Sequence, residues 1–186
     1  MNYFITYGDA AYVQSREYAI KKAKKYGFDC AIGYSEKDID SKFAEEHSDI
    51  LSQKFGGGLW LWKPYFILKT LQEVNEGDVV FYSDAGACFV KPIDKLINQT
   101  DDIVLFSGEY LEKWYTKPEL FQMMDCISPR FVGTLQVNAA FSVYRKKDKS
   151  IVFVKEWLDW CCHDGALILD TIYNENPSTE FEYIEH

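Results

Sequence analysis

The feature that most constrains how this chain folds is the apolar run Val-Val-Phe-Tyr at residues 79–82. The run does not alternate between apolar and polar residues, which is typical of a strand covered on both faces, as in parallel sheets. Open parallel sheets bind their ligands beyond the carboxyl ends of the strands. Asp84 follows the run two residues later. The sequence therefore predicts that the Asp84 side chain lies where a ligand would bind.

The segment before this run has the pattern of a helix. Pro64 suits the first turn of a helix, where its missing N–H costs nothing. Asn75-Glu76-Gly77 forms a stop signal, in which Gly77 is expected to take the left-handed conformation after the last helical turn. Apolar residues recur between these signals at helical spacing, namely Ile67, Leu68, Leu71 and Val74.

Three consecutive glycines, Gly56-Gly57-Gly58, precede this helix. No Gly-Lys-Ser/Thr follows them, so they do not form a P-loop. Two alternatives remain open, a flexible connector and a lid that orders over a ligand, with Trp60 or Trp62 closing the site. If the segment is extended, Trp60 and Trp62 lie on the same face, and at least one of them is expected in the core.

Strands and helices alternate along the whole chain. Strands are predicted at residues 3–7, 30–34, 79–82, 103–106 and 139–144. Helices are predicted at residues 11–26, 38–51, 64–74 and 116–124, and from Asp148 or Ser150 to about residue 162. Thr116 and Glu119 are expected to form a capping box. This order predicts one α/β domain over residues 1–186, Rossmann-like, with a mainly parallel sheet flanked by helices.

Composition excludes some classes of function. The net charge of −9 and pI near 4.8 argue against a nucleic-acid binder, which would present a basic footprint. A bound divalent cation could still offset local acidity at a phosphate site.

The five cysteines are irregularly spaced and predict reduced, mostly buried thiols in a cytoplasmic protein. The N-terminus lacks the pattern of a signal peptide, and no apolar run approaches the ~20 residues of a membrane span.

Several motifs together resemble those of bacterial glycosyltransferases of the GT-A type. The resemblance is to the group found in capsule and lipopolysaccharide gene clusters, and it covers nearly the whole chain. The motifs are Trp60-Leu61-Trp62-Lys63-Pro64-Tyr65, Gly77-Asp78, Tyr82-Ser83-Asp84-Ala85-Gly86, Trp114-Tyr115-Thr116-Lys117, Gln136-Val137-Asn138-Ala139-Ala140-Phe141 and Glu156-Trp157-Leu158. The first and third motifs are fairly specific as an ordered pair, although each alone is weak.

The resemblance implies a nucleotide sugar bound at the carboxyl ends of the strands. Lys63 would approach the diphosphate, and Asp84 would be the first aspartate of an Asp-x-Asp motif that holds the ribose or a divalent cation, Mn²⁺ or Mg²⁺. The nucleoside would meet Thr6, Tyr7, Gly8 and Asp9. The donor sugar would be contacted by Gln136, Asn138 and Ala139. The second aspartate of the motif is Gly86 here, and one carboxylate is a poor divalent site unless other ligands join it.

The residues themselves leave alternatives to these roles. Asp84 could merely cap the turn with Ala85-Gly86, and that turn can form without its carboxylate, so Asp84 is not expected to be needed for folding. Lys63 could be a solvated lysine, although a cation at a helix N-terminus is mildly unfavourable and so suggests a nearby anion. Gln136 and Asn138 share one face of an extended segment, where amides suit sugar hydroxyls, but they could also serve a turn.

The sequence thus predicts a glycosyltransferase that moves a sugar from a nucleotide-diphosphate donor, UDP-linked, to a hydroxyl of a glycan or lipid-linked glycan. It is expected in the cytoplasm, with peripheral association at the inner face of the membrane left open. Related chains continue past residue 186, so this one is expected to be truncated. The alternative is a non-catalytic nucleotide-sugar-binding domain. A nucleotidyltransferase is weaker, because no glycine-rich basic loop follows the first strand.

Overall fold

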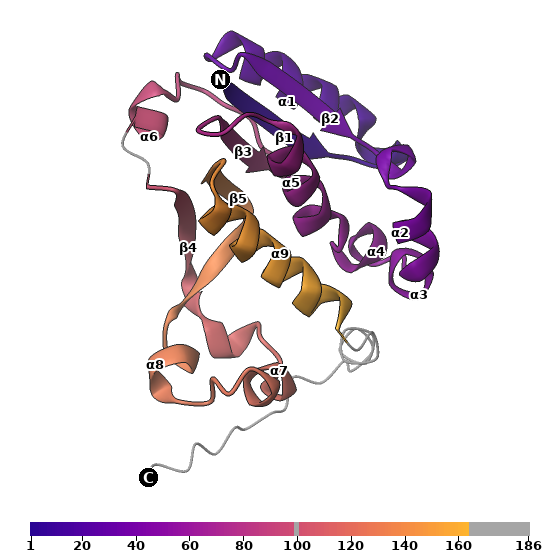
Figure 1. Cartoon of the computed structure of the whole chain (residues 1–186), viewed down its shortest axis with the longest axis vertical. Coiled ribbons are helices and arrows are strands. Elements are labelled where there is room, and N and C mark those ends of the chain that lie inside the picture. The colour runs from indigo at the N-terminus through magenta and orange to yellow at the C-terminus, as the bar shows by residue number, and fades with distance from the viewer. Residues whose placement is uncertain (99–100, 164–186) are drawn as a thin grey trace.

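The computed structural model describes residues 1–98 and 101–163. In this part of the chain a five-stranded sheet has the order β2-β1-β3-β5-β4 (Figure 1). Its strands are β1 (Asn2–Tyr7), β2 (Cys30–Tyr34), β3 (Val79–Ser83), β4 (Ile103–Leu111) and β5 (Leu135–Arg145). β1 pairs in parallel with β2 and β3, whereas β5 is antiparallel to β3 and β4. Because β5 alone is reversed, the predicted α/β fold with a mainly parallel sheet is confirmed.

Helices cover both faces of the sheet. The helices α5 (Trp62–Glu73) and α9 (Asp148–Cys162) pack on one face, and α1 (Val13–Lys25) and α6 (Asp94–Asn98) pack on the other (Figure 1). The remaining helices are short, namely α2 (Ser41–Glu46), α3 (Ser48–Leu51), α4 (Gly56–Leu59), α7 (Pro118–Met123) and α8 (Pro129–Val132). Single 3₁₀ turns lie at Ala10–Tyr12, Glu36–Asp38 and Glu112–Trp114.

The central strand β3 explains the unbroken apolar run. Val80 and Tyr82 join the core cluster beneath α5 and α9, while Val79 and Phe81 join the cluster beneath α1. Successive side chains of a strand point to opposite faces, and here both faces are covered, so every residue of β3 is buried. The pattern that predicted a doubly covered strand is confirmed.

The helix before β3 has the predicted buried stripe, because Ile67, Leu68, Leu71 and Val74 are all buried. Its end differs from the prediction. α5 stops at Glu73 and Val74 is extended, so Gly77 is not the residue that terminates the helix. Gly77 does have a positive φ of 85°, but within a separate turn in which the Asp78 N–H donates to the Asn75 carbonyl at 3.0 Å.

Two local predictions are wrong. The helix expected over residues 38–51 is broken at His47 into α2 and α3. The capping box at Thr116 does not form, because the Thr116 hydroxyl donates to the Glu112 carboxylate, and Lys117 precedes α7 without a side-chain cap. Glu112 follows β4 immediately, and its carbonyl accepts from the Thr116 N–H at 3.0 Å, the group that the Glu119 carboxylate would bind in a capping box.

The cysteines within the described residues form no disulfide, as expected, but four are half-buried and Cys88 is exposed, so they are not mostly buried. Among those same residues no helix is long and apolar enough to cross a membrane. The strand-like segment at residues 181–184 lies outside the described residues.

Candidate functional site

Three parallel strands end side by side and bring the predicted nucleotide-binding segments to one edge of the sheet. β1 ends at Tyr7, β2 at Tyr34 and β3 at Ser83, directly before Asp84. The chain remains hydrogen-bonded to the end of β2 just after β1, since the Gly8 N–H donates to the Tyr34 carbonyl at 3.1 Å. Thr6 and Gly8 are buried and Asp9 is half-buried. The sheet therefore gathers residues 6–9 and Asp84 at neighbouring strand ends.

Arg16 of α1 fastens this edge and was not predicted from the sequence. Its guanidinium donates to the carbonyls of Gly8 at 2.8 Å and Tyr34 at 3.1 Å. These carbonyls belong to two different strand ends, so one side chain holds both in place. The only indication in the sequence was that Arg16 lies on the helix that follows β1. The spacing between Gly8 and Arg16 matches no recognised motif.

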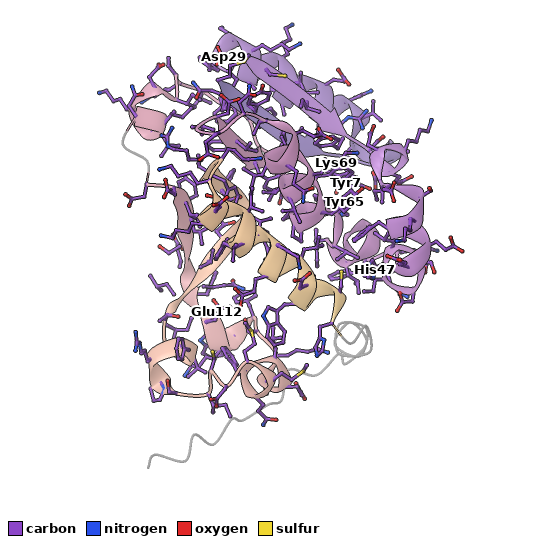
Figure 2. The ribbon with its side chains drawn as sticks, viewed as in Figure 1. Tyr7, Asp29, His47, Tyr65, Lys69 and Glu112 are labelled. Atoms are coloured by element: carbon purple, nitrogen blue, oxygen red, sulfur yellow. The ribbon has the colours of Figure 1, made fainter. Side chains whose placement is uncertain are left out.

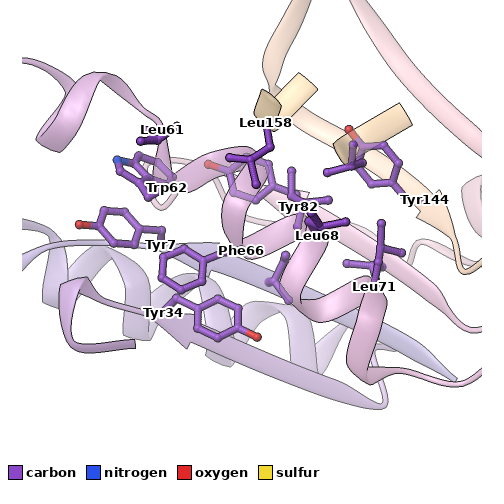
Figure 3. Packing of buried hydrophobic residues seen from close by; sticks show 14 of the residues in the cluster. Tyr7, Tyr34, Leu61, Trp62, Phe66, Leu68, Leu71, Tyr82, Tyr144 and Leu158 are labelled. Carbon is purple, nitrogen blue, oxygen red and sulfur yellow. The ribbon is translucent and has the colours of Figure 1, made fainter. Parts of the chain in front are cut away.

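Tyr7 is part of the core as much as of the edge. Its ring stacks on Trp62 at 4.1 Å and on Phe66 at 5.6 Å between ring centroids, and Phe66 in turn stacks on Tyr34 at 4.3 Å. Figure 3 shows these four rings packed against one another. Burial, with smaller effects from Glu36 and Asp9, raises the pKa of Tyr7 to about 12. Its contact with a nucleoside stays a prediction.

The three glycines form an ordered turn rather than a flexible connector. Residues 56–60 all have positive φ, including the non-glycine residues Leu59 at 52° and Trp60 at 59°. Each non-glycine residue held there costs about 1–2 kcal/mol. The turn is tied down because Trp62 Nε1 donates to the Gly56 carbonyl at 2.9 Å and the Gly58 N–H donates to the Gln53 carbonyl at 2.8 Å.

This turn lies against the end of β1. A Cβ added at Gly57 would be 3.8 Å from Asp9 Oδ2 and 3.8 Å from Trp62 Nε1. Trp60 is 45% exposed and Trp62 is 7% exposed, so one tryptophan is in the core, as expected. The segment is not extended, however, so the expectation that an extended backbone would place both tryptophans on one face does not apply. Closure of the turn as a lid stays a prediction.

Lys63 and Asp84 form an ion pair at the end of β3. Lys63 Nζ lies 3.0 Å from Asp84 Oδ1 and 3.3 Å from Asp84 Oδ2, and the Tyr82 hydroxyl also donates to Asp84 Oδ1. The Lys63 side chain is only 7% exposed, whereas that of Asp84 is 38% exposed. Burial first, and then the charge of Asp84, hold the pKa of Tyr82 well above its ordinary value. Residues 82 and 84 are two apart at a strand end, which is the signal that could have predicted this contact.

Asp84 is therefore bonded to a buried cation, and its carboxylate has a role in the folded chain that the sequence did not indicate. We expect Asp84→Asn to lower the free energy of unfolding by roughly 1–3 kcal/mol, since Lys63 would keep its charge in a buried place without a charged partner. Urea denaturation followed by circular dichroism measures this. The control is Asp159→Asn, which removes the carboxylate of the exposed Lys155–Asp159 pair and should change stability by at most about 0.5 kcal/mol. Equal effects of the two substitutions would contradict a structural role for Asp84.

The described residues at this edge do not fit a divalent-cation site. Both oxygens of Asp84 already contact an ammonium group. Within residues 1–98 and 101–163, no three side chains of His, Cys, Asp or Glu gather into a group that could hold a metal ion. Divalent Mg²⁺ and Ca²⁺ need several oxygen ligands, and one carboxylate shared with Lys63 does not provide them.

The predicted sugar-binding segment lies at an irregularity of β5. Leu105 pairs with Ser142 but Phe106 pairs with Asn138, so residues 139–141 bulge out of the β4–β5 ladder. The bulge meets the end of β3, because the Asp84 N–H donates to the Ala140 carbonyl at 3.0 Å. Bulges of this kind are common beside active sites, where they redirect side chains. Ala139 is exposed within the bulge.

Asn138 serves the bulge directly, since its Oδ1 accepts from the Ala140 N–H at 2.8 Å. Its oxygen thus has the local backbone role that was kept as the alternative, although this exposed side chain keeps an amide NH₂ group. Gln136 is half-buried and lies two residues farther from Asp84 along β5. Asn138 and Ala139 thus lie next to Ala140, which accepts from the Asp84 N–H, and the contact of Gln136, Asn138 and Ala139 with a sugar stays a prediction.

A cavity of about 560 Å³ lies elsewhere, between α7 and the end of α9. It is lined mainly by apolar residues, including Tyr115, Leu120, Met124, Phe153, Trp157 and Trp160. This region adjoins the 3₁₀ turn that contains Glu112, and Figure 2 shows Glu112 far from Tyr7. No residue predicted to bind the donor lines this cavity.

Comparison with solved structures identifies the architecture. The chain is similar to the apo form of the glycosyltransferase GlyE of Streptococcus pneumoniae TIGR4, with a TM-score of 0.50 and 16% identity over 93% of this chain. The fold is GT-A-like. At this identity the likeness is one of fold, and the chain spans 43% of the length of that GlyE structure.

Two further solved structures are similar to the GT-A-like chain. A second GlyE structure has a TM-score of 0.49 and 12% identity, covering 93% of this chain and 43% of that one. The galactosyltransferase LgtC, in complex with donor and acceptor sugar analogues, has a TM-score of 0.45 and 17% identity, covering 86% of this chain and 64% of that one. No protein-family model and no curated protein matches the sequence.

Proposed function

We propose that this GT-A-like chain takes part in glycosyl transfer from a nucleotide-diphosphate sugar, UDP-linked, to a hydroxyl of a cell-surface glycan or lipid-linked glycan. The observation that carries the proposal is the edge of the sheet itself. In a GT-A-like fold, the ends of β1 and β3 present residues 6–9 and Asp84, and the Lys63 ammonium lies within 3.0 Å of the Asp84 carboxylate. Ligands of α/β sheets bind at this kind of edge.

The chemistry of such a transfer makes two demands that this edge is suited to meet. The leaving diphosphate gains negative charge, which a fixed cation such as Lys63 stabilises. The donor and acceptor must also be held in alignment, and the amides of Gln136 and Asn138 supply the donors and acceptors that sugar hydroxyls need. The acceptor class, peripheral association with a membrane and the capsule or lipopolysaccharide pathway are extensions of the same proposal, drawn from the sequence resemblance.

A second candidate function is a domain that binds a nucleotide sugar without catalysis. One observation favours it: Gly86 stands in place of a second aspartate. A donor-hydrolysis assay separates the candidates. A transferase should slowly hydrolyse its donor and release the nucleoside diphosphate, whereas a binding domain should leave the donor intact.

We expect nucleoside diphosphates to stabilise the chain more than monophosphates, because the Lys63 ammonium at the start of α5 would attract the additional phosphate charge. A ligand present at about 100 times its dissociation constant adds ~2.7 kcal/mol of apparent stability. A thermal-shift comparison of UDP with UMP and free sugars measures the difference, with GDP, CDP, ADP and dTDP tested in parallel. Equal shifts for each diphosphate and its monophosphate would contradict the diphosphate assignment.

A further inference from the structure

The Lys63 ammonium occupies the position in which a divalent cation would have to bind Asp84. It contacts both oxygens of the carboxylate, at 3.0 Å and 3.3 Å. We propose that Lys63 takes the place of the divalent cation, so that a nucleoside diphosphate binds beside Asp84 without metal. This inference rests on the proposed function and adds to it the source of positive charge at the diphosphate.

Lys63 is held in place from several sides. It is the second residue of α5, and its Nζ lies 5.6 Å from the ring centroid of Trp62 and 5.5 Å from that of Tyr82. Cations are attracted to the faces of aromatic rings at such distances. Tyr82 also donates to the carboxylate that Lys63 contacts, so the three side chains form one connected group. A lysine fixed in this way loses little additional side-chain entropy when an anion arrives.

A divalent cation at Asp84 would have to displace this ammonium. The displaced Lys63 side chain is 7% exposed and would lose its partner while remaining largely enclosed, which is costly for a charge. A second carboxylate could offset that cost, but Gly86 provides none. Lack of space does not explain the glycine at this position, because a Cβ added at Gly86 would meet nothing within 4 Å. The described residues therefore favour the ammonium over the metal.

The start of α5 adds to the positive charge near Asp84. Lys63 lies in the first turn of this twelve-residue helix, where the helix dipole places partial positive charge. This charge disfavours a lysine and favours an anion. In the free chain the Asp84 carboxylate is that anion. A bound diphosphate would share the ammonium with it, and Asp84 acts as a positioning residue that keeps Lys63 at the strand end.

The test is isothermal titration calorimetry of UDP, with GDP, CDP, ADP and dTDP in parallel, in excess EDTA and in saturating MnCl₂. For the wild-type chain, we expect the dissociation constant of the best-binding diphosphate to differ by less than about threefold between the two conditions, a difference below 1 kcal/mol. Lys63→Met should weaken binding in EDTA by about tenfold or more. MnCl₂ should restore part of this loss, because the freed Asp84 carboxylate and the oxygens of the diphosphate can then bind the metal together.

Lys69→Met is the matched control, since Lys69 lies on the same helix but donates to the Asp38 carbonyl. It should bind diphosphates as the wild type does, with or without metal. Lys63→Arg, which keeps the charge, should retain most of the metal-free affinity. If Lys63→Met does not fold, the wild-type comparison still decides, because it requires no substitution.

The outcomes separate this inference from the proposed function. Wild-type binding that is tenfold or more tighter with Mn²⁺ would overturn the inference and leave the proposed function standing. Metal-free binding that is unchanged in Lys63→Met would overturn the role of Lys63 alone. A wild-type chain that binds none of the diphosphates in either condition would overturn the proposed function, and the inference with it.

Discussion

Replacing Phe66 with alanine is expected to lower the free energy of unfolding by about 3–5 kcal/mol, the range for removing a large buried aromatic side chain. Phe66 is 1% exposed and lies at the centre of the ring cluster beneath the strand ends (Figure 3). Its ring centroid is 4.3 Å from that of Tyr34 and 5.6 Å from that of Tyr7. The substitution leaves a cavity under two of the three strand ends, so diphosphate affinity should fall as well. Urea denaturation measures the stability, and calorimetry measures the affinity.

The control for this prediction is Phe153→Ala. Phe153 lies on α9 and is 36% exposed, so its loss should cost much less than the loss of Phe66. A milder second variant, Phe66→Leu, keeps most of the apolar volume and should fall between the wild type and Phe66→Ala. If Phe66→Ala costs no more than Phe153→Ala, the ring cluster does not support the edge of the sheet.

The second large effect is expected at Gly58. An added Cβ would lie 3.0 Å from the Leu51 Cα, a backbone atom that cannot move aside alone, and the φ of Gly58 is 95°. Strain from the positive φ costs about 1–2 kcal/mol, and the overlap adds roughly 1–3 kcal/mol. Gly58→Ala should therefore destabilise the chain by about 2–5 kcal/mol, as measured by chemical denaturation.

Two other glycines separate the backbone effect from the steric effect. Gly77 has a φ of 85° but open space around an added Cβ, so Gly77→Ala should show the backbone cost alone. Gly86 has open space and no positive φ, so Gly86→Ala should be nearly neutral. The expected order of destabilisation is Gly58→Ala, then Gly77→Ala, then Gly86→Ala. A Gly58→Ala variant as stable as Gly77→Ala would contradict the steric effect, because the turn at residues 56–60 would then have relaxed to accommodate the added methyl group.

The parts of the fold that were predicted from the sequence depend on local patterns. The run at residues 79–82 indicates burial on both faces of a strand, the helical spacing of Ile67, Leu68 and Leu71 indicates one buried helix face, and both were confirmed. The position of Asp84 at a strand end followed from the same reasoning. These features need no knowledge of which distant segment covers them.

The parts that were missed depend on contacts between distant residues. The Lys63–Asp84 pair joins positions 21 residues apart, and neither residue type alone indicates its partner. The capping box at Thr116 does not form because Glu112, directly after β4, binds both the hydroxyl and the N–H of Thr116. The sequence left a connector and a lid open for the three glycines, because φ angles are not visible in composition. Leu59 and Trp60 share its positive φ, which bulky residues seldom adopt.

The place of β5 in the sheet has a consequence for how the chain is made. β5 is the last strand of the described chain but lies between β3 and β4. A nascent chain that ends before residue 135 lacks β5, so one edge of β3 has no strand beside it and β4 has no partner. Unpaired apolar edges invite association with other chains, and domains emerge from the ribosome at about 5–20 residues per second. Until residues 135–145 are available to pair, the chain therefore keeps an open edge on β3 and an unpaired β4.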